Sequence, residues 1–238
     1  MTRRSSLYHR HRFPGEIISH CIWLYYRFSL SYRDIEELMA QRGVKVTYET
    51  IRQWCLKFGQ TIAEELRRRR PQPGNKWHLD EVYLKINGRT HYLWRAVGQQ
   101  GVVLDILVQS RRNKEAAIRF LRGLLKEMRY APRVIVTDKL KSYGAAIKEL
   151  KLEVEHRQHK GLNNRAENSH QPTRERERRM RRFKSAEQAQ RFLAPFGLIG
   201  GHFRVRRHRL KADHYRQEMG SRFRTWREVS GLTARALE

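Results

Sequence analysis

Residues 77–98 read WHLDEVYLKINGRTHYLWRAVG, and this stretch decides the fold of the chain. Asn87-Gly88 is the strongest short signal for a β-hairpin, because both residue types accept the positive φ angles of a two-residue turn. The runs on either side, 77–86 and 90–98, are rich in aromatic and β-branched residues and predict two antiparallel strands. Residues 102–108 supply a third extended run.

The chain beyond this hairpin alternates helical and extended patterns. One side of residues 114–128 is apolar at helical spacing, and the short apolar run 134–137 is typical of a buried parallel strand. The remaining elements expected are a helix at 142–150, a strand at 154–157 and a long arginine-rich helix that opens near Glu167. This order predicts a ribonuclease-H-like α/β domain, with a mixed five-stranded sheet and flanking helices, at residues 76–200.

The first 66 residues predict an all-α domain. Ser31 and Asp34 form the start of a capping box, and Gly43 is placed to end that helix. Thr47 can cap a second helix, which carries one clean apolar face. Two helices joined by a tight turn in a basic chain predict a helix-turn-helix, although an ordinary helical hairpin with a solvated polar face gives the same pattern. The side chains expected to face DNA are Tyr48, Arg52, Gln53 and Lys57.

A basic linker separates the two domains. Four arginines, two prolines and a glycine break every periodicity within residues 67–75. The last part of the chain, 201–238, is again basic and predicts a helical C-terminal extension. The expected organisation is therefore a helix-turn-helix domain at 1–66, a linker at 67–75, the ribonuclease-H-like domain at 76–200 and the extension at 201–238.

The charge of the chain indicates its partner. Lys and Arg number 51 against 24 acidic residues, which gives a formal net charge of +27 and a pI near 11.0. Such a one-signed excess repels itself unless a polyanion neutralises it, and nucleic acid is the commonest polyanion that a protein meets. Since 39% hydrophobic residues suffice for a core, the composition predicts a folded nucleic-acid-binding protein rather than a disordered basic tail.

Cysteine usage and hydropathy favour a cytoplasmic setting. The chain has two cysteines, Cys21 and Cys55, so neither a disulfide framework nor a cysteine zinc site is expected. The most apolar N-terminal stretch, 17–30, is interrupted by His20 and Arg27 and is too short to span a bilayer. No secretory cleavage pattern follows it, so we expect no membrane partner.

Three acidic residues stand in three different local settings. Asp80 lies in the first strand, Asp138 closes the apolar run 134–137, and Glu167 lies near the start of the arginine-rich helix. Acids against apolar strands are costly unless a cation holds them. In a sheet of this kind, carboxylates from the first strand and from the end of the adjacent parallel strand meet, and a later helix supplies a third. Such a trio suits two-metal phosphoryl transfer, which needs hard oxygen ligands around two ions roughly 4 Å apart.

Other polar residues near these acids receive lesser roles. Strand alternation separates Asp80 from Glu81, so we expect Asp80 to be the ligand and Glu81 to be a surface partner of a basic group. Asp105 lies in the third extended run without a helix-borne acid at comparable spacing. An Asp that ends a strand is by itself more often a cap than a ligand, so Asp138 depends on the joint pattern. The side chains expected to orient water or phosphate oxygens around the acids are His78, Lys139, His156, Asn164 and Asn168.

Several short strings together resemble the DDE transposases of insertion sequence family six. They are WHLDEVY at 77–83, RRN at 111–113, TDK at 137–139, YG at 143–144, EHRQ at 155–158, NNRAEN at 163–168, RFKS at 182–185 and FRVRRHRL at 203–210. The resemblance covers nearly the whole chain, and its strings are specific in combination.

The resemblance implies a prokaryotic mobile-element enzyme, located in the cytoplasm at the nucleoid, that uses two Mg²⁺ or Mn²⁺ ions. Such an enzyme binds the terminal inverted repeats of its element, cuts at the 3′ ends and joins them to target DNA, forming a cointegrate by replicative transposition. Asp80, Asp138 and Glu167 correspond to the catalytic triad, and Arg174 matches a basic residue that contacts DNA. Pro172 is expected to kink the helix between Glu167 and Arg174. Because two ends must be held together, at least a homodimer is expected.

Two other functions remain compatible with the sequence. A non-enzymatic DNA-binding protein, such as a repressor or an inactive copy, explains the charge and the helix-turn-helix. It does not explain three acids, because anions near bound phosphate cost affinity unless a metal neutralises them. A structure-selective nuclease of the same fold would cleave DNA without joining it.

Overall fold

A β-hairpin forms the centre of the sheet, as the sequence predicts. Strands β1 (Lys76–Ile86) and β2 (Arg89–Val97) pair antiparallel around the turn Asn87-Gly88. The two turn residues have φ angles of +49° and +75°, which Asn and Gly adopt readily and which reverse the chain within two residues. The resulting register places Asp80 directly opposite Arg95.

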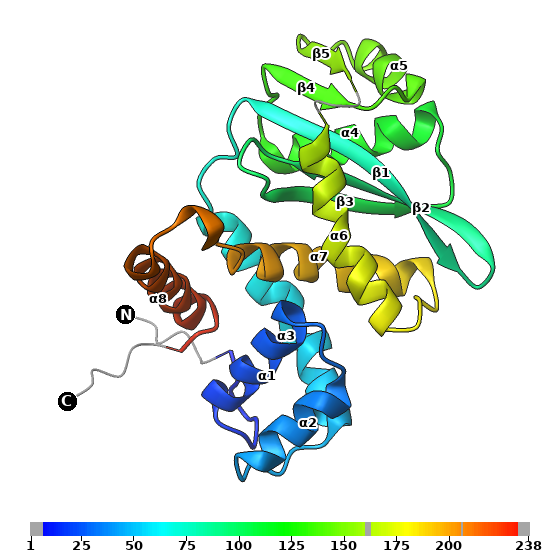
Figure 1. Cartoon of the computed structure of the whole chain (residues 1–238). Helices are drawn as coiled ribbons and strands as arrows, with labels where there is room; N and C mark the ends of the chain where they lie inside the picture. The colour runs from blue at the N-terminus through cyan, green and yellow to red at the C-terminus, as the bar shows by residue number, and fades with distance from the viewer. Residues whose placement is uncertain (1–6, 160–162, 206, 233–238) are drawn as a thin grey trace. The chain divides into compact units, whose positions relative to one another are not determined.

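The computed structural model describes residues 7–159, 163–205 and 207–232 (Figure 1). The chain divides into two compact units. One unit, Pro71–Ala194, contains the sheet, and the other combines the residues up to Arg70 with those from Pro195 onward.

Three further strands complete a mixed sheet (Figure 1). They are β3 (Val103–Gln109), β4 (Val134–Thr137) and β5 (Glu155–Gln158). The strand order is β3-β2-β1-β4-β5, in which β3 is antiparallel to β2 while β4 and β5 run parallel to β1. Helices α4 (Lys114–Met128) and α5 (Lys141–Glu149) precede β4 and β5 respectively. This is the ribonuclease-H-like arrangement, so the fold predicted from the sequence is confirmed.

The main core of this unit lies between the sheet and the helices α4 and α5. Trp77, Leu79 and Trp94, from one face of β1 and β2, are fully buried in a cluster that includes Phe120 of α4. Burial of each such large side chain stabilises the fold by about 1.5–3 kcal/mol. Helix α6 (Asn164–Arg179) lies across the opposite face of the sheet (Figure 1). The two faces of β1 are therefore covered by different helices.

The N-terminal helices are capped as the sequence predicts. They are α1 (Gly15–Arg27), α2 (Tyr32–Gln41) and α3 (Tyr48–Arg69). Ser31 Oγ accepts from the backbone N–H of Asp34 at 3.1 Å, while the Asp34 carboxylate accepts from the N–H of Ser31 at 2.8 Å. Thr47 Oγ1 caps α3 by accepting from the N–H of Thr50 at 3.3 Å. Helices α2 and α3, with their short connection, thus have the local form of a helix-turn-helix.

Helix α3 continues to Arg69 and so includes the first residues of the expected linker. Arginine is a good helix former, and cations near a helix C-terminus interact favourably with the helix dipole. The helix ends at Arg69, and Arg70 has extended backbone because the ring of Pro71 disfavours helical backbone in the residue before it. The run of arginines therefore extends the helix instead of forming a loop.

The described C-terminal elements are mainly helical. They are α7 (Ala186–His202), the 3₁₀ turn η2 (Arg207–Arg209) and α8 (Ala212–Val229). The unit that contains the sheet ends within α7, at Ala194, and the residues that follow belong to the unit of the N-terminal helices. In that unit, α8 packs on α3, where Arg69 pairs with Glu228 at 2.6 Å. In the described part of the chain, no helix has both the length and the apolarity that a bilayer crossing needs.

Candidate active site

The carboxylates meet where β4 ends beside β1. The parallel pairing of the two strands stops at His78 and Val136, and β4 itself stops at Thr137. Continuing that register by two residues places Asp138 beside Asp80. The structure does bring them together: ligand oxygens of Asp80, Glu81 and Asp138 all lie within 4.8 Å of one another. We call these three residues the acid cluster.

Glu81 is buried, so its expected position at the surface is wrong. Its side chain is 1% exposed, because α5 covers this face of β1. Glu81 Oε1 accepts from Arg112 Nε at 2.6 Å and from Nη2 at 2.5 Å, and Oε2 accepts from the Tyr143 hydroxyl at 2.8 Å. Arg112 Nη2 also lies 3.7 Å from Asp138 Oδ2. Glu81 is thus the partner of a basic group, as expected, but inside the protein.

The electrostatics of the acid cluster suit a divalent cation. Burial, together with the nearby charge of Asp138, raises the pKa of Asp80 to about 6 and that of Glu81 to about 7. Among the described residues, Arg112 supplies the one guanidinium within salt-bridge distance of the cluster. Three carboxylates against one cation leave an excess of negative charge on hard oxygen ligands, which is the environment that Mg²⁺ or Mn²⁺ requires.

On the opposite face of β1, Asp80 meets α6. His170 Nε2 lies 3.3 Å from Asp80 Oδ2, and the His170 side chain is almost fully buried. Burial lowers the pKa of His170 well below its usual value, and the charges of Arg95 and Arg174 lower it further. The ring is therefore neutral, and its contact with Asp80 is not an ion pair.

Helix α6 is attached to β1 through polar side chains. Asn163 Nδ2 donates to the Leu79 carbonyl at 2.9 Å, and Arg174 Nη1 donates to the Tyr83 carbonyl at 2.6 Å. Both carbonyls lie beyond the segment of β1 that β4 pairs with. The side chains therefore take the place of a neighbouring strand along that edge.

Arg95 fixes the middle of α6 from the sheet. Its guanidinium donates to the Ser169 carbonyl and, at 2.6 Å, to Thr173 Oγ1. The helix continues through Pro172, and beyond the proline Arg174 reaches the backbone of β1. These contacts on both sides of Pro172 hold the helix where the proline has no N–H to donate.

Glu167 lies on the attached side of α6 but outside the acid cluster. It follows Asn163 by four residues and precedes His170 by three, and these spacings place it on the same helix face. Its side chain is exposed, and no described residue forms a hydrogen bond or ion pair with its carboxylate. Two of the three predicted acids therefore meet in the structure, whereas Glu167 lies outside the acid cluster and has no hydrogen-bond or ion-pair partner among the described residues.

Of the five residues expected to orient water or phosphate oxygens, two are buried or hydrogen-bonded and three are exposed. His78 is buried in β1 on the Asp80 face, and His156 Nε2 lies 2.9 Å from Thr137 Oγ1, next to Asp138. Lys139, Asn164 and Asn168 are exposed, and their side chains make no hydrogen bond or ion pair with the described residues.

The residues expected to face DNA are all exposed on α3. Arg52 donates to both carboxylate oxygens of Glu49, at 2.8 and 2.6 Å, and Gln53 donates to the same carboxylate at 3.3 Å. Lys57 Nζ lies 3.0 Å from His11 Nε2, and the Tyr48 ring lies 5.2 Å from the guanidinium of Arg33.

Sequence reasoning missed four residues at the acid cluster: Arg95, Arg112, Tyr143 and His170. Two of them carried a usable signal. A two-residue turn at Asn87-Gly88 fixes the hairpin register and so places Arg95 opposite Asp80. His170 follows Glu167 by three residues and so shares its helix face. Arg112 and Tyr143 come from a loop and a helix whose approach to Glu81 no local pattern specifies.

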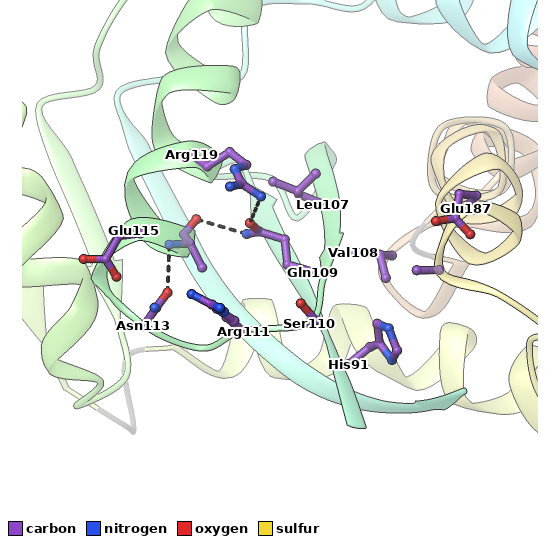
Figure 2. Close-up of a pocket in the computed structure, with 12 residues that line it drawn as sticks. His91, Leu107, Val108, Gln109, Ser110, Arg111, Asn113, Glu115, Arg119 and Glu187 are labelled. Atoms are coloured by element: carbon purple, nitrogen blue, oxygen red, sulfur yellow. Dashed lines mark hydrogen bonds between the residues drawn. The ribbon is translucent and has the colours of Figure 1, made fainter. Parts of the chain in front are cut away.

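A separate hollow lies at the start of α4 (Figure 2). Its volume is about 480 Å³, and none of the predicted site residues lines it. Its polar side chains bond to nearby groups: Gln109 Nε2 donates to the Ala116 carbonyl at 3.0 Å, and Arg119 Nη1 lies 3.4 Å from Gln109 Oε1. The acid cluster, and not this hollow, is therefore the candidate active site.

Comparison with known proteins agrees with this geometry. The sequence profile of the DDE domain matches residues 74–206. The transposase for the insertion sequence-like element IS431mec of Staphylococcus aureus (strain Mu50) is 32% identical over 181 residues, which cover 74% of this chain and 80% of that protein. The Staphylococcus aureus transposase of IS257 in transposon Tn4003 shows the same identity and coverage.

Solved structures align with this chain at low similarity. The catalytic domain of Mos1 mariner transposase aligns with a TM-score of 0.39 and 13% identity over 74% of this chain and 93% of that domain. The HTLV-2 integrase catalytic core in complex with magnesium aligns with a TM-score of 0.40 and 14% identity over 54% of this chain and 86% of that core. On the profile match and the identity to the IS431mec transposase, the chain belongs to the DDE transposases of insertion sequence family six, which carry out metal-dependent phosphoryl transfer on DNA.

Proposed function

We propose that this transposase cleaves DNA at the 3′ ends of its insertion sequence and transfers those ends to target DNA, with Asp80, Asp138 and Glu167 as the metal ligands. The observation that carries the proposal is the meeting of Asp80 and Asp138 at the end of β4, with a single guanidinium against three carboxylates. By resemblance to its family, the product is a cointegrate formed by replicative transposition.

Two Mg²⁺ or Mn²⁺ ions would be held by Asp80 and Asp138 from the sheet and by Glu167 from α6. When bound, the ions supply Lewis acidity at the scissile phosphate. Glu167 is a better third ligand than Glu81, because both carboxylate oxygens of Glu81 already accept hydrogen bonds from Arg112 and Tyr143. The free carboxylate of Glu167 lies on the α6 face that meets Asp80 through His170.

The remaining residues hold these ligands in position. Asn163 and Arg174 attach α6 to the edge of β1, so the turn that carries Glu167 stays beside Asp80. Glu81 holds Arg112 in place, and Arg112 offsets part of the negative charge before a metal binds. No step requires a covalent bond between protein and DNA, so a trapped adduct on a Ser or Tyr would contradict the proposal.

DNA would be bound by two groups of residues. In the helix-turn-helix, Tyr48, Arg52, Gln53 and Lys57 would read the terminal inverted repeat. Near the acids, Lys139 and Arg174 would contact phosphates, since Lys139 is exposed and the Arg174 side chain remains 43% exposed while it binds the Tyr83 carbonyl. Two ends must be held together for transfer, which requires at least a homodimer.

Divalent metal should stabilise the protein more at neutral than at acidic pH. The pKa values of Asp80 and Glu81 rise from 3.8 and 4.5 to about 6 and about 7 on folding. At these two sites the folded, metal-free protein therefore binds more protons than the unfolded chain between about pH 4 and pH 7, and their contribution to stability falls as the pH rises through that window. Mn²⁺ binds the ionised carboxylates, so it should raise the melting temperature near pH 7.5 and have little effect near pH 5. Thermal melts with Mn²⁺ or EDTA measure this, and an equal shift at both pH values would contradict it.

Asp80→Asn should reduce cleavage of end DNA to background while the protein still binds that DNA. The amide keeps the size of the side chain but removes a charge needed by the metal, and binding is unchanged or tighter because an anion near phosphate is lost. Asp105→Asn is the matched control, since Asp105 lies in β3 outside the acid cluster. Gel assays with labelled ends and Mg²⁺ separate cleavage, joining and binding. Cleavage by Asp80→Asn at the normal rate would remove the acid cluster from the reaction.

Glu167→Gln should also abolish cleavage, and this variant tests the third ligand. Glu175→Gln on the same helix is the control, since Glu175 is exposed and accepts from Gln171. The assay is the same, with Mn²⁺ titrated to detect weakened metal binding. If Glu167→Gln cleaves normally while Glu81→Gln does not, the third carboxylate is Glu81.

Arg52→Ala should weaken binding to the terminal repeat far more than binding to random DNA. A bidentate arginine contact with a base is worth about 1–3 kcal/mol of discrimination. Arg68→Ala is a close control, because Arg68 lies on the same helix and also pairs with a glutamate three residues earlier, at 2.5 Å. The control should reduce binding to both DNAs alike. Equilibrium binding at fixed salt measures the ratio, and an unchanged ratio for Arg52→Ala would remove that residue from base reading.

A further inference from the structure

Tyr83 is the most exposed large apolar side chain in the described part of the chain, at 55%. A single exposed apolar residue is common on protein surfaces. Tyr83 differs because of its place: it lies on β1 two residues after Glu81 and on the same face, so its Cα is about 7 Å from that of Glu81. A large aromatic ring is thus presented to solvent beside the acid cluster.

The Tyr83 ring is supported on one side although it is exposed. Its cross-strand neighbour is Tyr92, and the two ring centroids lie 5.4 Å apart at an interplanar angle of 52°. The carbonyl of Tyr83 accepts the hydrogen bond from Arg174, which holds the backbone at this point of β1. The ring therefore packs against a neighbouring ring and still presents surface to solvent.

Arg112 gives this surface a positive neighbour. Its guanidinium carbon lies 6.0 Å from the centroid of the Tyr83 ring. Nε and Nη2 are bound to Glu81, while Nη1 has no hydrogen-bond partner among the described residues, and the side chain is 32% exposed. A guanidinium with a free edge binds phosphate oxygens well. An aromatic ring that can stack on a base thus lies next to a cation that can bind a phosphate, and these are the two parts of a nucleotide.

We propose that Tyr83 stacks on a nucleobase next to the scissile phosphate and so positions the DNA strand for cleavage. The inference rests on the proposed function, because it places the scissile phosphate at the acid cluster. A base that leaves its own stack loses contact with its neighbours, and an aromatic side chain replaces that contact without regard to sequence. The occupant is a DNA strand rather than an apolar protein surface, since Arg112 and the net charge of +27 favour a polyanion.

The test uses full-length protein and a duplex that carries the terminal inverted repeat flanking the reading frame. Tyr83→Phe should keep the wild-type rate, whereas Tyr83→Leu and Tyr83→Ala should lose about five- to 150-fold, the range expected for one base stacked on an aromatic ring. Val102→Ala is the control, since Val102 is 42% exposed in the same unit. Leucine can replace tyrosine in an apolar contact with protein but has no aromatic face on which a base can stack. A fully active Tyr83→Leu would therefore overturn the proposal.

Abasic sites placed one at a time around the cleavage position identify the stacked base. At the contacted position, the abasic site should slow the wild-type enzyme as much as Tyr83→Leu does and should cause no further loss in Tyr83→Leu. Independent, multiplying losses at every position would overturn the proposal. A different result would contradict the proposed function itself. Normal cleavage by Asp80→Asn would do so, whatever the activities of the Tyr83 variants.

Discussion

Strand β1 runs for 11 residues while its parallel neighbour β4 runs for four, and the site depends on the edge of β1 that this difference leaves open. The end of β4 delivers Asp138 to the side of Asp80. Beyond that point, Asn163 and Arg174 of α6 satisfy the carbonyls of Leu79 and Tyr83 that β4 does not reach. An unpaired strand edge would otherwise expose polar backbone, and here it becomes the attachment site of a helix.

Charge balance explains how three carboxylates are tolerated in one place. Isolated buried anions would be strongly destabilising, and the raised pKa values of Asp80 and Glu81 record that penalty. Arg112 offsets part of it and remains partly exposed. Arg112 thus balances only part of the negative charge of the acid cluster, and a divalent cation would balance the rest, although the chain as a whole is strongly basic.

Local patterns sufficed to predict the five strands and most of the helices, because turn residues, caps and apolar periodicity act over a few residues. The meeting of Asp80 with Asp138 also followed, since adjacent parallel strands end at the same edge. The burial of Glu81 did not follow, because alternation tells which face a side chain takes but not which helix covers that face. Local rules treat Pro172 as a helix-disturbing residue, and they do not show that Arg95, distant in the sequence, contacts α6 on both sides of it.

The two-residue turn of the hairpin has a consequence for how such chains can vary in length. Trp94 faces the core and Arg95 faces α6 only because β2 leaves the turn in this register. If one added residue at Asn87-Gly88 shifted this register, Trp94 and Arg95 would exchange faces of the sheet. The guanidinium of Arg95 would then be buried among apolar side chains, and its hydrogen bonds to α6 would be lost. A change in the length of this turn should therefore disrupt the site as strongly as the substitution of a catalytic residue. The turn nevertheless lies seven residues from Asp80, the nearest of the three predicted ligands.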